Sequence, residues 1–321
     1  MRTGFWRDGA AFALSLGLGF AACASRSSLG AEVTAGKGGA SATTLPALPP
    51  KAPMNLEQAR RYVLALVNRD RAEHGLSPVV MDDAANRAGQ RHAEDMARVG
   101  YTAHWGSDGS VPEQRYSEAG GSDFVQENAG CLADGKSRKL DAVPRFEPAE
   151  LERVERAFMD EKPPHDGHRK NILKARHTGF GVGVAKPSGV GIACLSQEFV
   201  DDYGDYTALP KAARAGELLT IAGDVKGIVS FGGVGIGRSE PQVALTAAYL
   251  NTTYTYAVPS PSELYFPKGF VTKKPVEVNG KHFRIEVPLG KPGRYEVSVW
   301  GKFPGAGQQL EMVSLRVIDV R

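Results

Sequence analysis

The chain has 321 residues, 42% of them hydrophobic, and its formal net charge at pH 7 is +3. This length exceeds that of a typical single domain, so we expect two folded units plus processing segments. Because the net charge is small and no run of Lys and Arg dominates, the composition argues against a nucleic-acid partner.

The first residues have the pattern of an export signal. Arg2 and Arg7 precede an apolar run at residues 10–22, which is too short to span a bilayer comfortably. Small residues stand directly before Cys23, as at the processing site of a bacterial lipoprotein, and ordinary signal cleavage near the same residues is the alternative. We predict an export signal over residues 1–23, lipidation at Cys23, and a location in the outer cell envelope or outside the cell.

The next segment predicts a tether. Residues 24–53 are mostly Gly, Ala, Ser, Thr and Pro, with little to bury. A flexible linker of this kind suits a lipid-anchored protein whose domain stands away from the membrane, and it suits a secreted chain equally well.

Two cysteines remain after Cys23, namely Cys131 and Cys194. In an oxidising compartment such a pair predicts a disulfide. A catalytic cysteine paired with a histidine is the alternative, but Cys194 falls within a strand-like run at residues 190–200. We therefore prefer the disulfide.

Apolar residues that recur every three or four positions predict three amphipathic helices. The helices run from Asn55 to Gly75, from Asp82 or Asp83 to Gly100, and from Pro148 to about Glu161. The first has a capping box, with Gln58 three residues after Asn55. Residues 101–130 lack helical periodicity and are rich in Gly, Ser and Asp, which is typical of a functional loop.

Two antiparallel strands are predicted after the third helix, at residues 180–184 and 192–199. They are joined by the turn Lys186-Pro187-Ser188-Gly189. Helices followed by a compact strand pair predict an α/β sandwich domain over residues 54–203.

The rest of the chain, residues 204–321, predicts a small antiparallel β-sandwich as an accessory domain. Its β-rich runs are residues 218–221, 243–249, 252–258, 283–287, 295–299 and 312–320. The stretch Gly232 to Gly237 could be taken for a phosphate loop, but no helix follows it. A glycine-rich turn or bulge is the preferred interpretation.

Four polar residues stand out in the first domain: His104, Glu127, Glu161 and His168. Two neutral imidazoles can ligate a divalent ion, while carboxylates orient them, hold a water or act as a general base. His165, three residues before His168, is a competing metal ligand that we expect at the rim of the site. The alternative is that these groups only satisfy one another as buried polar residues.

Four motifs occur in chain order around these residues. They are VNR through EHGL at residues 67–76, YTAHWGSDGS at 101–110, QENAG at 126–130, and GHRKNIL with GFGVGVA at 167–185. Together they resemble the CAP superfamily, named after cysteine-rich secretory proteins, antigen 5 and pathogenesis-related 1 proteins, whose module is also called the SCP domain. The resemblance covers about residues 55–199 and is strongest to the bacterial branch.

The resemblance implies an α-β-α sandwich with a central antiparallel sheet and a cleft that holds a tetrad. In this sequence the tetrad falls on His104, Glu127, Glu161 and His168. The family's histidine pair has been associated with divalent cations, and some members bind sterols or fatty acids in other grooves. Protease activity is attributed to only a few members, so membership does not by itself define the chemistry.

We therefore predict an exported cell-envelope protein that binds a ligand or partner, with a divalent cation, zinc or calcium, at His104 and His168. The expected ligand is an envelope or extracellular component such as a lipid or cell-wall fragment, and the only expected membrane contact is the lipid anchor. One alternative is a metal-dependent hydrolase in which Glu127 or Glu161 takes the proton. The other is a lipid or sterol carrier.

Overall fold

The computed structural model describes residues 50, 53–240, 243–253 and 255–321. The predicted export signal, Cys23 and nearly all of the predicted linker lie outside the described residues. No helix within the described ranges is long and apolar enough to cross a membrane.

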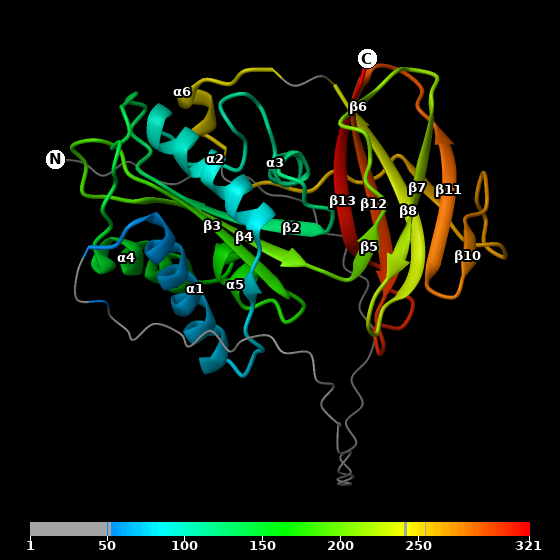
Figure 1. Ribbon diagram of the computed structural model, residues 1–321, viewed down its shortest axis with the longest axis horizontal. Coiled ribbons are helices and arrows are strands. Elements are labelled where there is room, and N and C mark those ends of the chain that lie inside the picture. Colours follow the sequence, from blue (N-terminus) through cyan, green and yellow to red (C-terminus); the bar gives the residue numbers. More distant parts are fainter. Residues whose placement is uncertain (1–49, 51–52, 241–242, 254) are drawn as a thin grey trace, which may run out of the picture. The chain divides into compact units, whose positions relative to one another are not determined.

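A four-stranded sheet with the order β1-β3-β4-β2 forms the centre of the first part of the chain (Figure 1). Its strands are β1 (Val80–Met81), β2 (Phe124–Gly130), β3 (Gly179–Ala185) and β4 (Cys194–Asp201). Strands β2 and β3 pair antiparallel with β4, whereas the short β1 pairs parallel with β3. The predicted pair at residues 180–184 and 192–199 is therefore confirmed.

Helices cover both faces of this sheet (Figure 1). One face carries α1 (Leu56–Glu73), α4 (Pro148–Met159) and α5 (Gly167–Ile172), and the other carries α2 (Asp83–Val99) and α3 (Pro112–Glu118). The predicted α-β-α sandwich is confirmed. Helix α3 and strand β2 lie within residues 101–130, which the sequence predicted as a loop, because both are short and lack a clear apolar period.

The sequence GFGVGVA of β3 shows how one strand packs two different layers. Its large side chains enter the core shared with α1 and α4, and they are Phe180, Val182 and Val184. The alternating glycines face α2, because side chains alternate across a strand. A Cβ on Gly183 would lie 2.0 Å from the carbonyl oxygen of Gly89 in α2. Helix α2 therefore packs directly on the strand backbone, and a side chain at this position would push the helix away.

The helix ends agree with the sequence. Asn55 and Gln58 form the predicted capping box of α1. Gly100 ends α2 in the left-handed conformation, with φ of 80°, which favours glycine. Pro148 opens α4.

The second part of the chain contains two sheets that share one core. The first has the order β10-β11-β7-β5 and the second the order β6-β13-β12-β8-β9. The strands are β5 (Gly204–Tyr206), β6 (Ala212–Ala213), β7 (Leu218–Val225), β8 (Ser230–Ser239), β9 (Glu263–Tyr265), β10 (Glu277–Asn279), β11 (His282–Pro288), β12 (Gly293–Lys302) and β13 (Glu311–Val320). Ile221, Phe283 and Val297 are among the fully buried residues of the core. This sheet-rich region is the one predicted from the sequence.

The predictions of strands at residues 243–249 and 252–258 are wrong. The described residues there form only the short helix α6 (Ala247–Leu250) and irregular chain. Instead of pairing within a sheet, this segment packs on the first part of the chain. Leu250 is buried beside Met96 and Tyr101, and the backbone N–H of Leu245 donates to the carbonyl of Ser107. Contacts with residues far away in sequence therefore override the local β-propensity.

The glycine-rich stretch at 232–237 lies inside β8 and is not a turn. Its pairing with β12 is irregular at Gly232, which is a β-bulge. Of the two predicted alternatives, a turn or a bulge, the bulge is therefore present. A Cβ on Gly235 would lie 2.5 Å from Oγ of Ser298 on the adjacent strand. Close packing, and not phosphate binding, accounts for the glycines.

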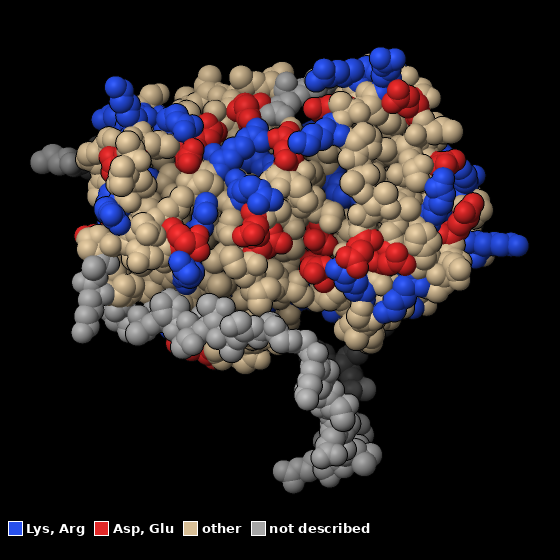
Figure 2. Space-filling view, viewed as in Figure 1, with Lys and Arg blue, Asp and Glu red and all other residues tan. Residues whose placement is uncertain are grey.

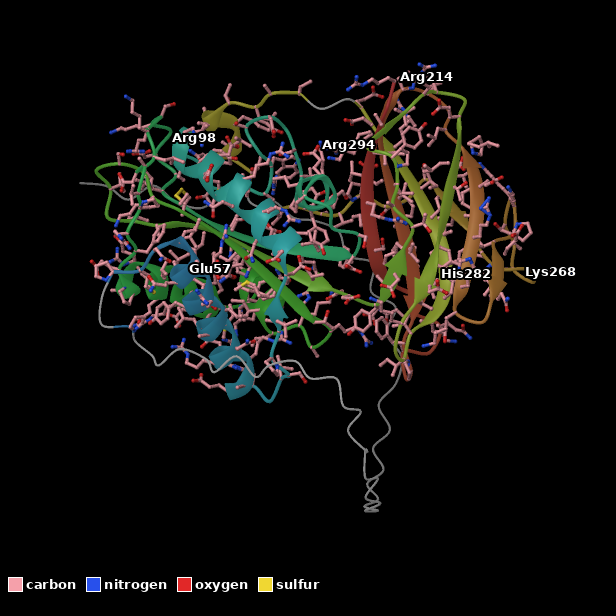
Figure 3. The ribbon with its side chains drawn as sticks, viewed as in Figure 1. Glu57, Arg98, Arg214, Lys268, His282 and Arg294 are labelled. Carbon is pink, nitrogen blue, oxygen red and sulfur yellow. A yellow bond between two sulfur atoms is a disulfide. The ribbon has the colours of Figure 1, made fainter. Side chains whose placement is uncertain are left out.

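The edge of β13 lies against α3 and the turn that follows it. The backbone N–H of Val317 donates to Oγ of Ser117 at 3.1 Å, and Ser314 donates to the carbonyl of Ser122 at 2.5 Å. Arg294 of β12, labelled in Figure 3, contacts Gln114 of α3 with 3.5 Å between Nη1 and Oε1. These contacts cover part of the strand edge with protein.

Candidate functional site

The four residues predicted as a site come together at the edge of the first sheet. Glu127 is in the middle of β2, the last strand in the sheet order. His104 lies in the loop after α2, Glu161 just beyond α4, and His168 in the first turn of α5. The ring centroids of the two histidines are 6.3 Å apart. The site is thus assembled from four separate segments.

Each imidazole is oriented by one carboxylate. Nδ1 of His104 is 3.0 Å from Oε1 of Glu127, and Nδ1 of His168 is 2.6 Å from Oε1 of Glu161. In a neutral ring this contact places the proton on Nδ1 and leaves Nε2 as an acceptor. Neither Nε2 has a hydrogen-bond partner among the described residues, and the two side chains are 18% and 28% exposed. Both rings therefore keep one nitrogen available.

The carboxylate of Glu127 is buried and fully engaged. Its Oε2 accepts from Nη2 of Arg115 at 2.6 Å and from Oγ of Ser196 at 2.9 Å. Arg115 is buried too, and the same Nη2 donates to the carbonyl of His104 at 3.0 Å. Burial alone would raise the pKa of Glu127, but the charge of Arg115 overrides it and holds the pKa well below its usual range. Glu127 is therefore ionised at neutral pH.

A second buried carboxyl group, Glu198, lies directly opposite Glu127 on β4. Burial and the negative charge of Glu127 raise the pKa of Glu198 well above its ordinary value, so Glu198 keeps its proton at neutral pH. Oγ of Ser196 is 2.8 Å from Oε1 of Glu198. The Ser196 hydroxyl therefore lies between the two carboxyl groups, within hydrogen-bond distance of both. The cluster thus holds one negative charge against the one positive charge of Arg115.

His92 completes the buried cluster without adding charge. Its Nε2 is 2.7 Å from the carbonyl oxygen of Ala103, and its side chain is fully buried. Burial lowers the pKa of His92 to about 4, so the ring is neutral. His92 packs beneath the site and does not reach solvent.

Glu161 fixes both the side chain and the backbone of His168. Its Oε2 accepts from the backbone N–H of His168 at 2.9 Å and of Arg169 at 3.4 Å. The amide of Asn128 donates to the carbonyl of His168 at 3.2 Å. Burial lowers the pKa of His168, although Glu161 opposes this effect, so the ring is neutral at neutral pH.

A comparison with models of known families found one match. The model of the CAP family, described as the cysteine-rich secretory protein family, matches residues 64–199. The protein contains a CAP domain.

Two solved structures are similar to part of this chain. An extracellular protein containing a SCP domain, from Bacillus anthracis, is 19% identical with a TM-score of 0.36, and the match covers 46% of this chain and 41% of that one. An outer surface protein from Borrelia burgdorferi is 16% identical with a TM-score of 0.36, covering 46% of this chain and 96% of that one. This chain thus spans less than half of the Bacillus protein. A comparison with curated proteins gave no match.

Aromatic rings surround the histidine pair of the CAP domain. Phe158 lies 4.6 Å from His168, and Tyr256 lies 6.2 Å from His104, measured between ring centroids. Tyr256 also makes an edge contact with Trp105 at 5.0 Å. Because Tyr256 belongs to the connection between β8 and β9, the surroundings of the site include a residue from outside the CAP domain.

His165 is placed apart from the histidine pair. It is exposed in the turn between α4 and α5, where its backbone N–H donates to the carbonyl of Lys162. It makes no ring contact or hydrogen bond with His104 or His168 among the described residues. The sequence spacing that suggested His165 as a metal ligand does not bring it to the other two rings.

The predicted disulfide between Cys131 and Cys194 is confirmed. It joins the chain just after β2 to the first residue of β4, next to a small core that includes Ala93 and Ala97 of α2. The alternative of a catalytic cysteine at position 194 is therefore wrong.

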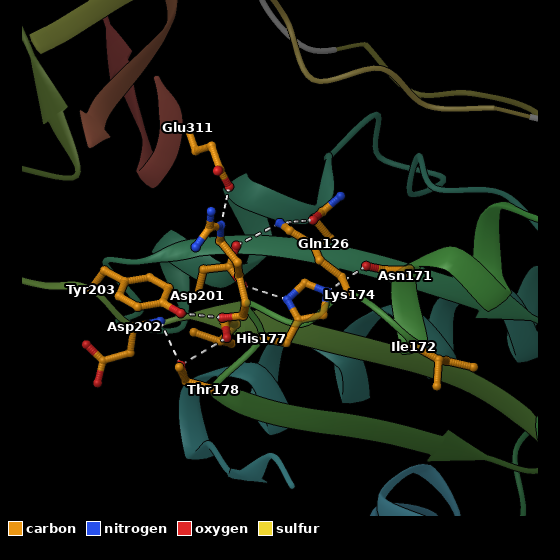
Figure 4. Close-up of polar contacts among 12 residues, drawn as sticks. Gln126, Asn171, Ile172, Lys174, His177, Thr178, Asp201, Asp202, Tyr203 and Glu311 are labelled. Carbon is orange, nitrogen blue, oxygen red and sulfur yellow. Dashed lines mark hydrogen bonds and ion pairs between the residues drawn. The ribbon is translucent and has the colours of Figure 1, made fainter. Parts of the chain in front are cut away.

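A second histidine–carboxylate pair lies inside the CAP domain (Figure 4). Nδ1 of His177 is 2.6 Å from Oδ1 of Asp201, and its Nε2 is 3.0 Å from Oδ1 of Asn171. Nζ of Lys174 donates to Oδ2 of Asp201 at 2.7 Å and to Oε1 of Gln126 at 2.6 Å. Burial lowers the pKa of His177, whereas His177 and Lys174 together lower the pKa of Asp201 against the effect of its burial. This network ties the GHRKNIL segment to β4 and β2.

The CAP domain offers a metal ion only part of a coordination shell. Within the part of the chain that the structure describes, no three His, Cys, Asp or Glu side chains form a group that could hold an ion. The two carboxylates of the tetrad contact the imidazoles at Nδ1 and so serve as their orienting partners. The protein atoms available as metal ligands are Nε2 of His104 and Nε2 of His168.

Proposed function

We propose that the CAP domain binds a divalent cation between His104 and His168 and, through it, an envelope or extracellular ligand. The observation that carries the proposal is the pair of hydrogen bonds from Nδ1 to Glu127 and Glu161, at 3.0 and 2.6 Å. In metal sites, a carboxylate that accepts from one imidazole nitrogen fixes the tautomer and makes the other nitrogen a better ligand. Both rings here have this arrangement.

The donor atoms fit zinc better than calcium. Imidazole nitrogen is a usual ligand of zinc, whereas calcium and magnesium take oxygen ligands. Two protein nitrogens leave at least two positions of a four-coordinate ion for water or for a ligand. A cation held in this way supplies a positive anchor, and the neutral state of His168 at neutral pH makes its nitrogen available.

The carboxylates favour binding over hydrolysis. A general base needs a free lone pair and a pKa near the working pH. Glu127 is held at a low pKa by Arg115, and both of its oxygens accept hydrogen bonds. Glu161 accepts from the backbone and side chain of His168. Neither carboxylate is placed to take a proton from water.

The cavity between α1 and α4 does not favour lipid carriage. It has a volume of about 380 Å³, and Met159 is the one lining side chain that is not ionisable. Arg69, Arg156 and Asp160 are among the others. An apolar ligand would remove these charges from water without pairing them, which is costly.

The proposed location outside the cytoplasm depends on the N-terminal segment. The motif at residues 1–23, the lipidation site Cys23 and the tether after it support export and anchoring at the cell envelope. On the face shown in Figure 2, basic and acidic side chains are interspersed, which agrees with a partner other than nucleic acid.

Calorimetric titration of the full chain with zinc, calcium and magnesium tests the proposal. We expect zinc to bind, and we expect His104→Ala and His168→Ala each to weaken its binding at least about tenfold, because each removes one of two protein ligands.

The matched control is His165→Ala, which removes an exposed imidazole from the same segment and should bind zinc like the parent. Undiminished zinc binding by the double variant at positions 104 and 168 would contradict the proposal. A loss in His165→Ala alone would place the ion on a different residue.

A further inference from the structure

A cavity of about 310 Å³ lies where the edge of β13 meets the CAP domain. Its walls are α3 with the turn after it, the segment of residues 206–211, and residues 316–319 of β13. The volume is at the lower end of the range for small-molecule sites. None of the tetrad residues lines this cavity, so a ligand bound here would not contact the proposed cation site.

Arg316 is a buried cation in the wall of this cavity. The residue is 4% exposed, and its Nη1 donates to the carbonyl of Thr207 at 2.7 Å. The guanidinium carbon lies 5.2 Å from the ring centroid of Tyr206. A hydrogen bond on one side and an aromatic ring beside it hold the planar group in one orientation.

The other two nitrogens of Arg316 are buried and have no partner among the described residues. These atoms are Nε and Nη2. Their N–H groups point the same way along one edge of the planar guanidinium, which is the edge that pairs with the two oxygens of a carboxylate. Buried donors without acceptors are costly, so this free edge is an unsatisfied, pre-oriented binding group.

No ionised carboxylate of the described residues neutralises Arg316 at this edge. Asp123 is the carboxyl group whose charge would act on Arg316, but burial and the charge of Asp202 raise the pKa of Asp123 to about 8. Asp123 is therefore mostly protonated at pH 7. Glu118 and Asp319 also line the cavity, but Glu118 is paired with Arg91, and the charges that act on Arg316 are those of Tyr206 and Asp123. Burial lowers the pKa of Arg316 only to about 10, so the guanidinium stays charged.

We propose that this cavity binds the carboxylate of a small organic anion through Nε and Nη2 of Arg316. The apolar body of the anion lies against Tyr206 and Leu209, which both line the cavity. Two sources share this chemistry, a free organic acid and the carboxyl terminus of a peptide. Both end in a planar, singly charged group that matches the free edge of the guanidinium.

Calorimetry on the full chain at pH 7 tests the proposal with butyrate and with acetyl-trialanine, each measured beside its amide. We expect the two acids to bind and the amides not to bind. Arg316→Lys keeps the charge but loses the planar edge, so it should weaken acid binding at least about tenfold, and Arg316→Gln should abolish it. If Arg316→Gln does not fold, Arg316→Lys carries the test.

Two controls separate this site from other effects. Lys211→Gln removes an exposed cation from the same cavity and should weaken binding less than about threefold. His104→Ala should bind both acids like the parent, whatever its zinc affinity.

Tighter binding of acetyl-trialanine than of butyrate assigns the site to peptide ends, and the reverse assigns it to free organic acids. Three outcomes would overturn the proposal: no binding of either acid, equal binding of the amides, or undiminished binding by Arg316→Lys. Inorganic phosphate that binds as tightly as the acids would overturn the carboxylate class.

Discussion

Two histidine–carboxylate pairs of the CAP domain have the same geometry but different surroundings. In both, Nδ1 lies 2.6 Å from a carboxylate oxygen, in His168 with Glu161 and in His177 with Asp201. The second nitrogen of His177 is bonded to Asn171, and the ring is fully buried. The second nitrogen of His168 has no partner among the described residues, and the side chain is 28% exposed. The pairing itself is therefore common to both histidines, whereas the second nitrogen without a partner distinguishes the one in the proposed site.

The pair of His104 with Glu127 combines features of both. Its imidazole is partly exposed like that of His168, but its carboxylate is buried like Asp201 and is held by Arg115. Glu127 thus has two roles. On its inner side, Oε2 pairs with the buried Arg115 and supports the fold. On its outer side, Oε1 orients the imidazole of His104. The comparison predicts that substitutions on the inner side cost stability and that those on the outer side cost binding.

The largest effect is expected from Arg115→Met. This change leaves Glu127 as an unpaired buried charge next to Glu198, and we expect a loss of about 3–5 kcal/mol in the free energy of unfolding. Urea denaturation measures it. The double variant Arg115→Met/Glu127→Gln should be less destabilised than the single variant, because the uncompensated charge is gone. A loss below about 1 kcal/mol for Arg115→Met would mean that the buried pair does not support the fold.

A smaller effect is expected from His177→Ala. It leaves Asp201 and Asn171 without their shared partner in the interior, and we expect a loss of about 2–3 kcal/mol in the free energy of unfolding. His168→Ala is the matched control, and should cost about 1 kcal/mol or less because its ring is partly solvated. The comparison between the two pairs fails if His168→Ala destabilises the protein as much as His177→Ala does.

The last effect concerns pH. Burial and the neighbouring charge of Asp70 raise the pKa of Glu155 to about 8, from 4.5 for a free side chain. The folded protein keeps this proton while the unfolded chain releases it, so stability is full below about pH 4.5 and falls as pH rises towards 8. Glu155→Gln keeps the hydrogen-bonding shape without titrating. Between pH 5 and pH 8 its melting temperature should fall about 10 °C less than that of the parent.

Asp160→Asn, at an exposed position beyond the end of α4, is the control for this measurement. It should leave the pH profile unchanged. A parent protein whose melting temperature does not fall between pH 5 and 8 would show that Glu155 is ionised when folded.

The sequence was sufficient for the features that depend on local patterns. The capping box at Asn55 and the glycine end of α2 each have a direct physical cause in neighbouring residues. The tetrad could be predicted because four motifs carry it. Its geometry follows from the position of Glu127 on the edge strand of the sheet.

The sequence was insufficient where the partner lies far away in the chain. Arg115 and Ser196, which hold Glu127, come from a short helix and a strand that share no motif with it. Glu198 was missed because the burial of every residue of its strand is known only from the structure. The β-prone run at residues 243–249 was misassigned because its contacts are with residues near position 100.

The contacts of Asn251 bear on the order in which the histidine site forms during synthesis. The side chain of Asn251 accepts from the N–H of Thr102, 149 residues earlier, and donates to the carbonyl of Gly100. A chain made from its N-terminus completes the CAP sequence long before it reaches this residue, and domains tend to fold in that order. The loop that carries His104 therefore gains these two hydrogen bonds only after residue 251 has been synthesised, well after the end of the CAP sequence.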